Sequence, residues 1–170
     1  MERELHPAAL AAEDLLRQCE TERLRRSGPG GQRRNKVETG VRIRHQSTGV
    51  RAEACERRSQ AENQQIALGR LRIHLALEIR RPLESGQAPG PLWHSRLSDG
   101  RISVNPSHED FPALLAEALD RIAAHQGDVK AAADALLCTP SQLIKLLKKE
   151  ARALPLVNRW RDEQGLGPLR

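Results

Sequence analysis

Residues 28–31 are Gly-Pro-Gly-Gly, and this run cannot belong to a regular helix or strand. Glycine adopts positive φ angles freely, while proline fixes its own φ and lacks a backbone N–H donor. Because three of the four positions lack a Cβ, the backbone can approach a partner closely and can present N–H groups to an anion or a carbonyl oxygen. The run therefore predicts an exposed loop suited to close contact.

Gln32 provides the first side chain beyond the glycines. Its neutral amide can donate and accept hydrogen bonds, but it is a poor proton acceptor and no nucleophile. The cations Arg33, Arg34 and Lys36 follow, and they suit phosphates. A nucleotide-binding P-loop is excluded because no Gly-Lys-Ser/Thr follows at the required spacing. Any chemistry at this loop would depend on positioning and polarisation.

Positive charge is concentrated around the loop. Residues 23–58 hold eleven Lys and Arg against three Asp and Glu, a balance of +8, whereas residues 82–170 hold eleven of each. With one Phe, two Trp and no Tyr in the chain, base stacking cannot be the main mode of nucleic-acid binding. The charge pattern predicts a phosphate-binding face, and the alternative is a basic surface that is merely solvated.

Alternating apolar residues predict an antiparallel hairpin over residues 37–55, with Arg42 and Arg44 together on its wet face. Ser59 begins a capping box, which opens an amphipathic helix that covers the sheet. A short helix is expected over residues 7–18. The apolar positions of the long helix are Leu68, Leu71, Leu75 and Ile79.

The rest of the chain has a different character. Prolines and glycines over residues 82–104 indicate a linker, in which Trp93 would anchor the segment to the first domain. Residues 105–170 are predicted to be helical, with Asp128 and Thr139 capping two short helices that resemble a Fis-like helix-turn-helix. The second short helix holds the candidate phosphate contacts, Lys145, Lys148 and Lys149. A small helical bundle with a solvated basic face explains this pattern equally well.

Several motifs between residues 19 and 81 occur together and in a fixed order. They are Arg26-Ser27-Gly28, Gly30-Gly31-Gln32, Asn35-Lys36, Val41-Arg42-Ile43-Arg44-His45, Thr48-Gly49-Val50 and Glu56-Arg57-Arg58-Ser59-Gln60. This stretch resembles the GGQ domain of bacterial class I peptide chain release factors. The resemblance also implies a strand at about residues 19–26, where the apolar alternation is diluted by arginines.

The resemblance implies that Gln32 helps a water molecule attack the ester bond of peptidyl-tRNA, through its backbone N–H and its side chain. Gly30 and Gly31 would give the loop its shape. The residues expected at RNA are Arg26, Arg33, Arg34, Lys36, Arg42 and Arg44. The chain departs from the usual family pattern in having Pro29 for an alanine and Arg33-Arg34 for His-Val. Pro29 should reduce the entropic cost of ordering the loop.

Taken together, the patterns predict an α+β fold: a GGQ domain at residues 1–81, a linker at 82–104 and a helical module at 105–170. The three cysteines are widely spaced and no Cys/His cluster accompanies them, which argues against a zinc site or disulfides and suits a reducing cytoplasm. We expect no metal, no cofactor, no signal peptide, no membrane span and a monomer.

Two functions remain open at this point. The first is hydrolysis of peptidyl-tRNA on the ribosome without stop-codon reading, in translation termination or ribosome rescue. The chain resembles the short standalone release factor-like proteins in this respect, because 170 residues leave no room for a codon-reading domain. The partners would then be the rRNA of the peptidyl transferase centre and peptidyl-tRNA. The second is a non-catalytic RNA-, ribosome- or DNA-binding regulator that uses the GGQ fold as a scaffold. A glutamine at the loop tip favours the first, since a scaffold needs no amide there.

Overall fold

The computed structural model describes residues 5–25, 39–84 and 86–170. The chain divides into two compact units, Met1–Glu78 and Ile79–Arg170. Helices are combined with small antiparallel sheets, so the predicted α+β class is confirmed. The predicted site residues that lie outside the described residues are Arg26, Gly30, Gly31, Gln32, Arg33, Arg34 and Lys36.

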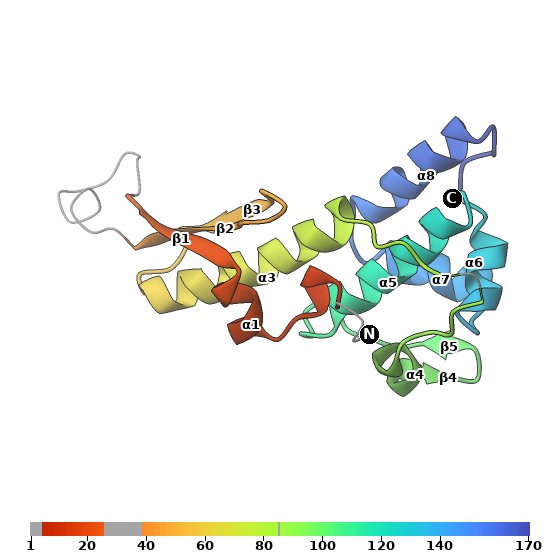
Figure 1. Ribbon diagram of the computed structural model, residues 1–170, viewed down its shortest axis with the longest axis horizontal. Helices are drawn as coiled ribbons and strands as arrows, with labels where there is room; N and C mark the ends of the chain where they lie inside the picture. The colour runs from red at the N-terminus through yellow and green to blue at the C-terminus, as the bar shows by residue number, and fades with distance from the viewer. Residues whose placement is uncertain (1–4, 26–38, 85) are drawn as a thin grey trace. The chain divides into compact units, whose positions relative to one another are not determined.

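The first unit consists of a three-stranded antiparallel sheet, in the order β1-β2-β3, lying over one long helix (Figure 1). Its elements are η1 Pro7–Ala9, α1 Ala12–Arg17, β1 Cys19–Leu24, β2 Gly40–His45, β3 Arg51–Ala54 and α3 Gln60–Glu78. The predicted hairpin is present in β2 and β3, whose registers pair Val41 with Ala54 and Ile43 with Ala52. These four side chains are buried, as the alternation requires.

Helix α3 supplies the opposite side of this core. Leu68, Leu71 and Leu75 are buried at the predicted helical spacing. The hydroxyl of Ser59 accepts a hydrogen bond from the backbone N–H of Glu62 at 3.4 Å, so the predicted capping residue begins the helix. α3 packs against β2 and β3, and β1 is the edge strand that pairs with the other side of β2.

The N-terminal helix is shorter and more broken than the sequence predicts. A single turn, η1, is capped by His6, whose Nδ1 accepts a hydrogen bond from the N–H of Ala8 at 3.0 Å. Leu10 and Ala11 are then extended, so that α1 begins only at Ala12. The predicted helix over residues 7–18 is therefore two short helices.

The second unit begins with a segment that the sequence suggested would be a linker. Residues 82–104 instead contain helix α4 Pro91–Arg96 and a hairpin of β4 Leu97–Ser98 and β5 Arg101–Ile102. Trp93 is fully buried, and its indole Nε1 donates a hydrogen bond to the carbonyl oxygen of Leu136 at 2.8 Å. Trp93 therefore anchors this segment within the second unit, and not to the first domain as expected.

Four helices make up most of the second unit: α5 Phe111–Ala124, α6 Val129–Ala135, α7 Pro140–Leu147 and α8 Ala153–Glu163. α5 is buried along most of its length and contacts α6, α7 and α8. Gly127 follows α5 with a φ of 81°, and its N–H donates to the carbonyl oxygen of Ile122, so a glycine in the left-handed region ends this helix. Asp128 and Thr139 cap α6 and α7 as predicted. α8 lies in the region predicted to be helical, although no individual helix was predicted there.

Candidate functional site

The described residues show how the glycine-rich segment is joined to the sheet. β1 ends at Leu24, β2 begins at Gly40, and these two residues are direct partners in the antiparallel register. A Cβ added at Gly40 would lie 2.9 Å from the carbonyl oxygen of Leu24, so only glycine fits this close approach of the two strands. Residues 25–39 therefore connect two adjacent strands, and the two ends of this segment lie side by side at one end of the sheet.

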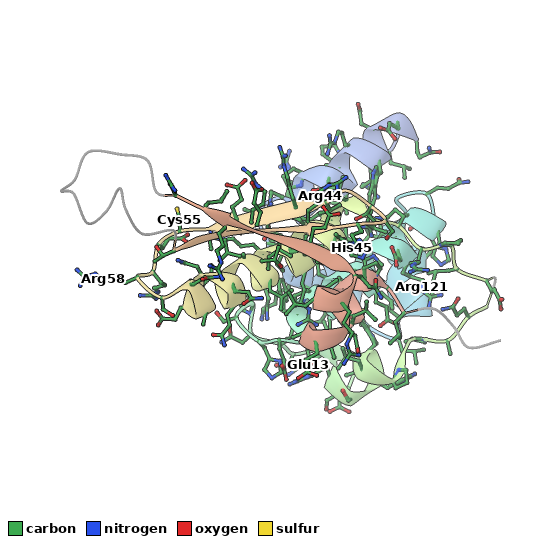
Figure 2. The ribbon with its side chains drawn as sticks, turned by 60° about the vertical axis from the view of Figure 1, so that its left-hand side comes forward. Glu13, Arg44, His45, Cys55, Arg58 and Arg121 are labelled. Carbon is green, nitrogen blue, oxygen red and sulfur yellow. The ribbon has the colours of Figure 1, made fainter. Side chains whose placement is uncertain are left out.

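The turn between β3 and α3 lies at the same end of the sheet. A Cβ at Gly40 would contact the Cβ of Cys55 at 3.4 Å, which places the start of this turn beside the start of β2. Arg57 and Arg58 follow in the turn, and both are exposed. Figure 2 shows Arg58 extending away from α3 into solvent. In the described part of the chain, neither guanidinium makes an ion pair with an acidic residue.

The acidic residue of this turn is already neutralised. Glu56 accepts a hydrogen bond from the Arg70 guanidinium, which also donates to the carbonyl oxygen of Glu53 at 2.7 Å. The bond from Arg70 lowers the pKa of the Glu56 carboxyl. The charges of Arg57 and Arg58 are therefore uncompensated by the turn, and these two arginines are candidate phosphate contacts that the predicted site residues did not include. Their place in the basic stretch 23–58 was the available signal.

Arg42 and Arg44 lie in β2 on the face of the sheet opposite the buried Val41 and Ile43, as predicted. Both are paired with carboxylates. Arg42 donates to Glu53 at 2.6 Å and to Glu22 at 2.9 Å, and Arg44 donates to Glu20 at 3.4 Å. The hydrogen bonds to Glu53 and Glu22 raise the pKa of Arg42. The sheet thus presents mixed charge around Arg42 and Arg44, in contrast to the turn with Arg57 and Arg58 at its loop end.

The lysines predicted on the helix-turn-helix occupy two kinds of position. Lys145 and Lys148 are exposed on and just after α7. Lys149 is half-buried, and its ammonium donates to the carbonyl oxygen of Val104. Lys149 therefore links the residues that follow β5 to the residues that follow α7. Lys145 and Lys148 remain accessible.

Over the residues that the structure describes, no group of three or more His, Cys, Asp or Glu side chains is arranged to hold a metal ion. Burial raises the pKa of the Cys19 thiol to about 11, and that of Cys138 likewise to about 11, so both favour the neutral thiol. None of the described helices is both long enough and apolar enough to cross a membrane.

Residues 15–89 match the model of the RF-1 domain family. This match supports the resemblance of the segment to the class I release factors. The match contains β1, β2, β3 and α3 together with Gly30, Gly31 and Gln32, so the RF-1 domain coincides with most of the first unit and extends into the second.

Several peptide chain release factors are similar to part of the chain. The chain is 34% identical over 90 residues to peptide chain release factor 2 of Acidovorax sp. (strain JS42), covering 52% of this chain and 22% of that protein. It is 40% identical over 101 residues to peptide chain release factor 1 of Chlorobaculum tepidum, covering 59% and 26%. It is 32% identical over 130 residues to peptide chain release factor 1 of Frankia casuarinae, covering 65% and 36%. The chain thus spans between about a fifth and a third of the length of these relatives.

Proposed function

We propose that this protein promotes hydrolysis of the ester bond of peptidyl-tRNA on the ribosome, without reading a stop codon. The partners are the rRNA around the peptidyl transferase centre and the peptidyl-tRNA itself. We confine the function to ester hydrolysis because the chain spans only part of the release factors that it resembles. No cofactor is required by this chemistry.

In the proposed reaction, the oxygen of a water molecule bonds to the ester carbonyl carbon. The bond from that carbon to the 3′ oxygen of the terminal ribose then breaks, and the ribose oxygen takes the proton that the attacking water loses. Gln32 can contribute a backbone N–H and a side-chain amide, which are donors and acceptors for orienting water and for stabilising the developing oxyanion. Because an amide is a poor base, we assign Gln32 a positioning and polarising role in place of general base catalysis.

The observation that carries the proposal is the occurrence of Gly30-Gly31-Gln32 within the matched RF-1 domain. Two structural findings support it. The segment that contains Gln32 starts and ends on adjacent paired strands, at Leu24 and Gly40, so its two ends are held together. The unpaired cations Arg57 and Arg58 lie at that same end of the sheet, where rRNA phosphates would be met.

A scaffold function is the competing candidate. It is favoured by the exposed Lys145 and Lys148 on the second helix of the α6–α7 pair, a position at which helix-turn-helix proteins contact phosphates. A regulator of that kind would bind RNA, ribosomes or DNA and would release no peptide, which makes peptide release the discriminating measurement.

The test is release of a labelled peptide from stalled ribosome complexes, comparing the wild type with Gln32→Ala. We expect the substitution to slow release roughly 100- to 1,000-fold, the range seen when one donor to an oxyanion is removed. Gln46→Ala is the matched control, since Gln46 is exposed in the turn at the opposite end of the hairpin. Gly31→Val should be at least as damaging as Gln32→Ala because a branched side chain excludes positive-φ conformations. Equal release by the wild type, Gln32→Ala and Gln46→Ala would overturn the catalytic assignment and favour the regulator.

A further inference from the structure

A buried amide side chain lies where the glycine-rich segment rejoins the sheet. Asn63, in the first turn of α3, has no exposed surface. A buried side-chain amide costs free energy unless its donors and acceptor find partners. A polar residue at this position, in a helix whose other buried side chains are apolar or small, therefore calls for an explanation from its contacts.

The amide of Asn63 bridges two segments that are distant in sequence. Its Nδ2 donates a hydrogen bond to the carbonyl oxygen of Thr39 at 2.6 Å and another to the carbonyl oxygen of Arg57 at 3.0 Å. Its Oδ1 accepts a hydrogen bond from the N–H of Arg57 at 2.9 Å. Both amide protons and one acceptor site are thus used on main-chain groups, so the rotamer of Asn63 is fixed from two sides.

These contacts fix two parts of the candidate site. Thr39 is the last residue before β2, and it directly precedes Gly40, the partner of Leu24. Arg57 belongs to the turn that carries the unpaired cations. Asn63, in the first turn of a 19-residue helix, therefore sets the position of the end of the glycine-rich segment relative to the basic turn.

This bridge can affect the position of Gln32 because the segment that contains Gln32 is short. Gln32 is seven residues from Arg25 and seven from Thr39, at the middle of the segment 25–39. One end of that segment is fixed by the Leu24–Gly40 pair, and the other by the bond from Asn63. A shift in the carbonyl group of Thr39 changes the direction in which this end of the segment leaves the sheet.

We propose that Asn63 is a positioning residue for peptide release. Its side-chain amide holds the main chains of Thr39 and Arg57 together and so fixes one end of the segment that brings Gln32 to the ester. This role rests on the proposed function. Asn63 touches no substrate, and it acts through the main chain of Thr39.

Asn63→Asp is the sharpest test. The carboxylate has nearly the same shape and still accepts from the N–H of Arg57, but it loses both donors and brings a carboxylate oxygen against the Thr39 carbonyl. We expect the maximal rate of peptide release at saturating protein to fall roughly 10- to 100-fold, as for a misplaced reacting group. The protein concentration at half-maximal rate should change by less than about threefold, because no cationic side chain is removed and the carboxylate still accepts from the N–H of Arg57.

Two control variants distinguish a loss of positioning from two other effects that Asn63→Asp could have: an added negative charge and a lower stability. Gln65→Glu makes the same amide-to-acid change on the exposed side of the same turn of α3, and it should retain the wild-type rate. Leu75→Ala removes a fully buried side chain of α3 about 18 Å farther along the helix, so it destabilises the unit without touching the bridge. Rates are compared at a temperature at which circular dichroism shows all four proteins to be folded.

Amide hydrogen exchange provides a readout that does not depend on catalysis. Exchange at residues 39–41 should be faster in Asn63→Asp than in Leu75→Ala, while exchange in the middle of α3 should be no faster in Asn63→Asp than in Leu75→Ala. An active wild type whose Asn63→Asp variant releases peptide as fast as Leu75→Ala would overturn the role of Asn63 alone. A wild type that releases no more peptide than Gln32→Ala would overturn the proposed function, and the role of Asn63 with it.

Discussion

The indole Nε1 of Trp93 donates a hydrogen bond to the main-chain carbonyl oxygen of Leu136, 2.8 Å away. Trp93 lies in α4, and Leu136 caps the C-terminal end of α6. Both side chains are fully buried. A single donor thus joins the proline- and glycine-rich segment to the turn between α6 and α7, and this contact makes that segment part of the second unit.

Trp93→Phe should destabilise the second unit by about 1–3 kcal/mol, because the buried carbonyl of Leu136 loses its donor while most of the apolar volume is retained. The measurement is urea unfolding followed by the fluorescence of Trp160, the other tryptophan of the chain, which lies in α8 of the same unit. His94→Ala, at the exposed next position of α4, is the control and should leave the unfolding midpoint nearly unchanged. An unaltered midpoint in Trp93→Phe would show that the hydrogen bond contributes nothing to stability.

A buried ion pair should give the second unit a measurable pH dependence. Asp120 accepts a hydrogen bond from Arg80 at 2.9 Å, and its side chain is only 5% exposed. Burial raises the pKa of Asp120 from 3.8 to about 6, although the charge of Arg80 opposes this shift. The folded protein therefore binds the proton more tightly than the unfolded chain does. The contribution of this group to stability is complete below about pH 4 and is lost as the pH rises to about 6.

Asp120→Asn should remove that dependence. The free energy of unfolding of the wild type, relative to the variant, should fall between about pH 4 and pH 6 by no more than roughly 3 kcal/mol. Arg80 stays protonated throughout this range. The loss of its partner therefore changes the free energy of unfolding of the variant by the same amount at every pH. Urea unfolding at a series of pH values measures the difference, and a difference that is constant with pH would contradict the raised pKa.

Arg58 should contribute to ribosome binding through a phosphate contact. Because its guanidinium is exposed and unpaired in the described part of the chain, Arg58→Gln should reduce the slope of log affinity against log salt concentration by about 0.7–0.9, the effect of one phosphate contact. Arg17→Gln removes the same charge from α1, where Arg17 pairs with Asp14 at 2.9 Å, at the opposite end of β1 from the loop. Equal slopes for these two variants would mean that the turn is only a solvated surface.

The sequence predicted those parts of the fold that depend on local periodicity. Val41 and Ile43 alternate with arginines, so the hairpin and its buried face followed directly. Thr139 and Asp128 are capping residues whose hydrogen bonds reach only two or three positions along the chain. The bounds of α8 were not predicted, because Pro155 and the glycines after residue 164 interrupt the helical pattern. Pro155 lies near the start of the helix, where a missing N–H costs little.

The candidate site was predicted less completely because its supporting contacts are not local. The motif predicts a role for Gln32 at the ester, and that assignment stays a prediction. Nothing in the spacing of Asn63 distinguishes it from Gln64 and Gln65, which follow it. Its partner Thr39 is 24 positions earlier in the chain. Likewise, Arg42 and Arg58 look equivalent in the sequence, and only the register of β2 with β1 and β3 shows that Arg42 is paired with glutamates.

The last prediction concerns the independence of the two units. A fragment of residues 1–78 should fold alone, because the apolar faces of β2, β3 and α3 bury one another. Circular dichroism should show a cooperative unfolding transition for this fragment. It should retain peptide release at high concentration and lose affinity for ribosomes, since the second unit no longer raises the local concentration of the loop at its target.

A fragment of residues 1–104 is the informative comparison. It retains Trp93 but lacks Leu136, so the indole loses both its acceptor and its buried environment. Its tryptophan fluorescence should therefore resemble that of a solvent-exposed indole, and it should aggregate more readily than fragment 1–78. Two outcomes would contradict this division of the chain: an unfolded fragment 1–78, or a fragment 1–78 with the full ribosome affinity of the intact protein. The first would show that the first unit does not fold without residues of the second, and the second that the second unit adds nothing to binding.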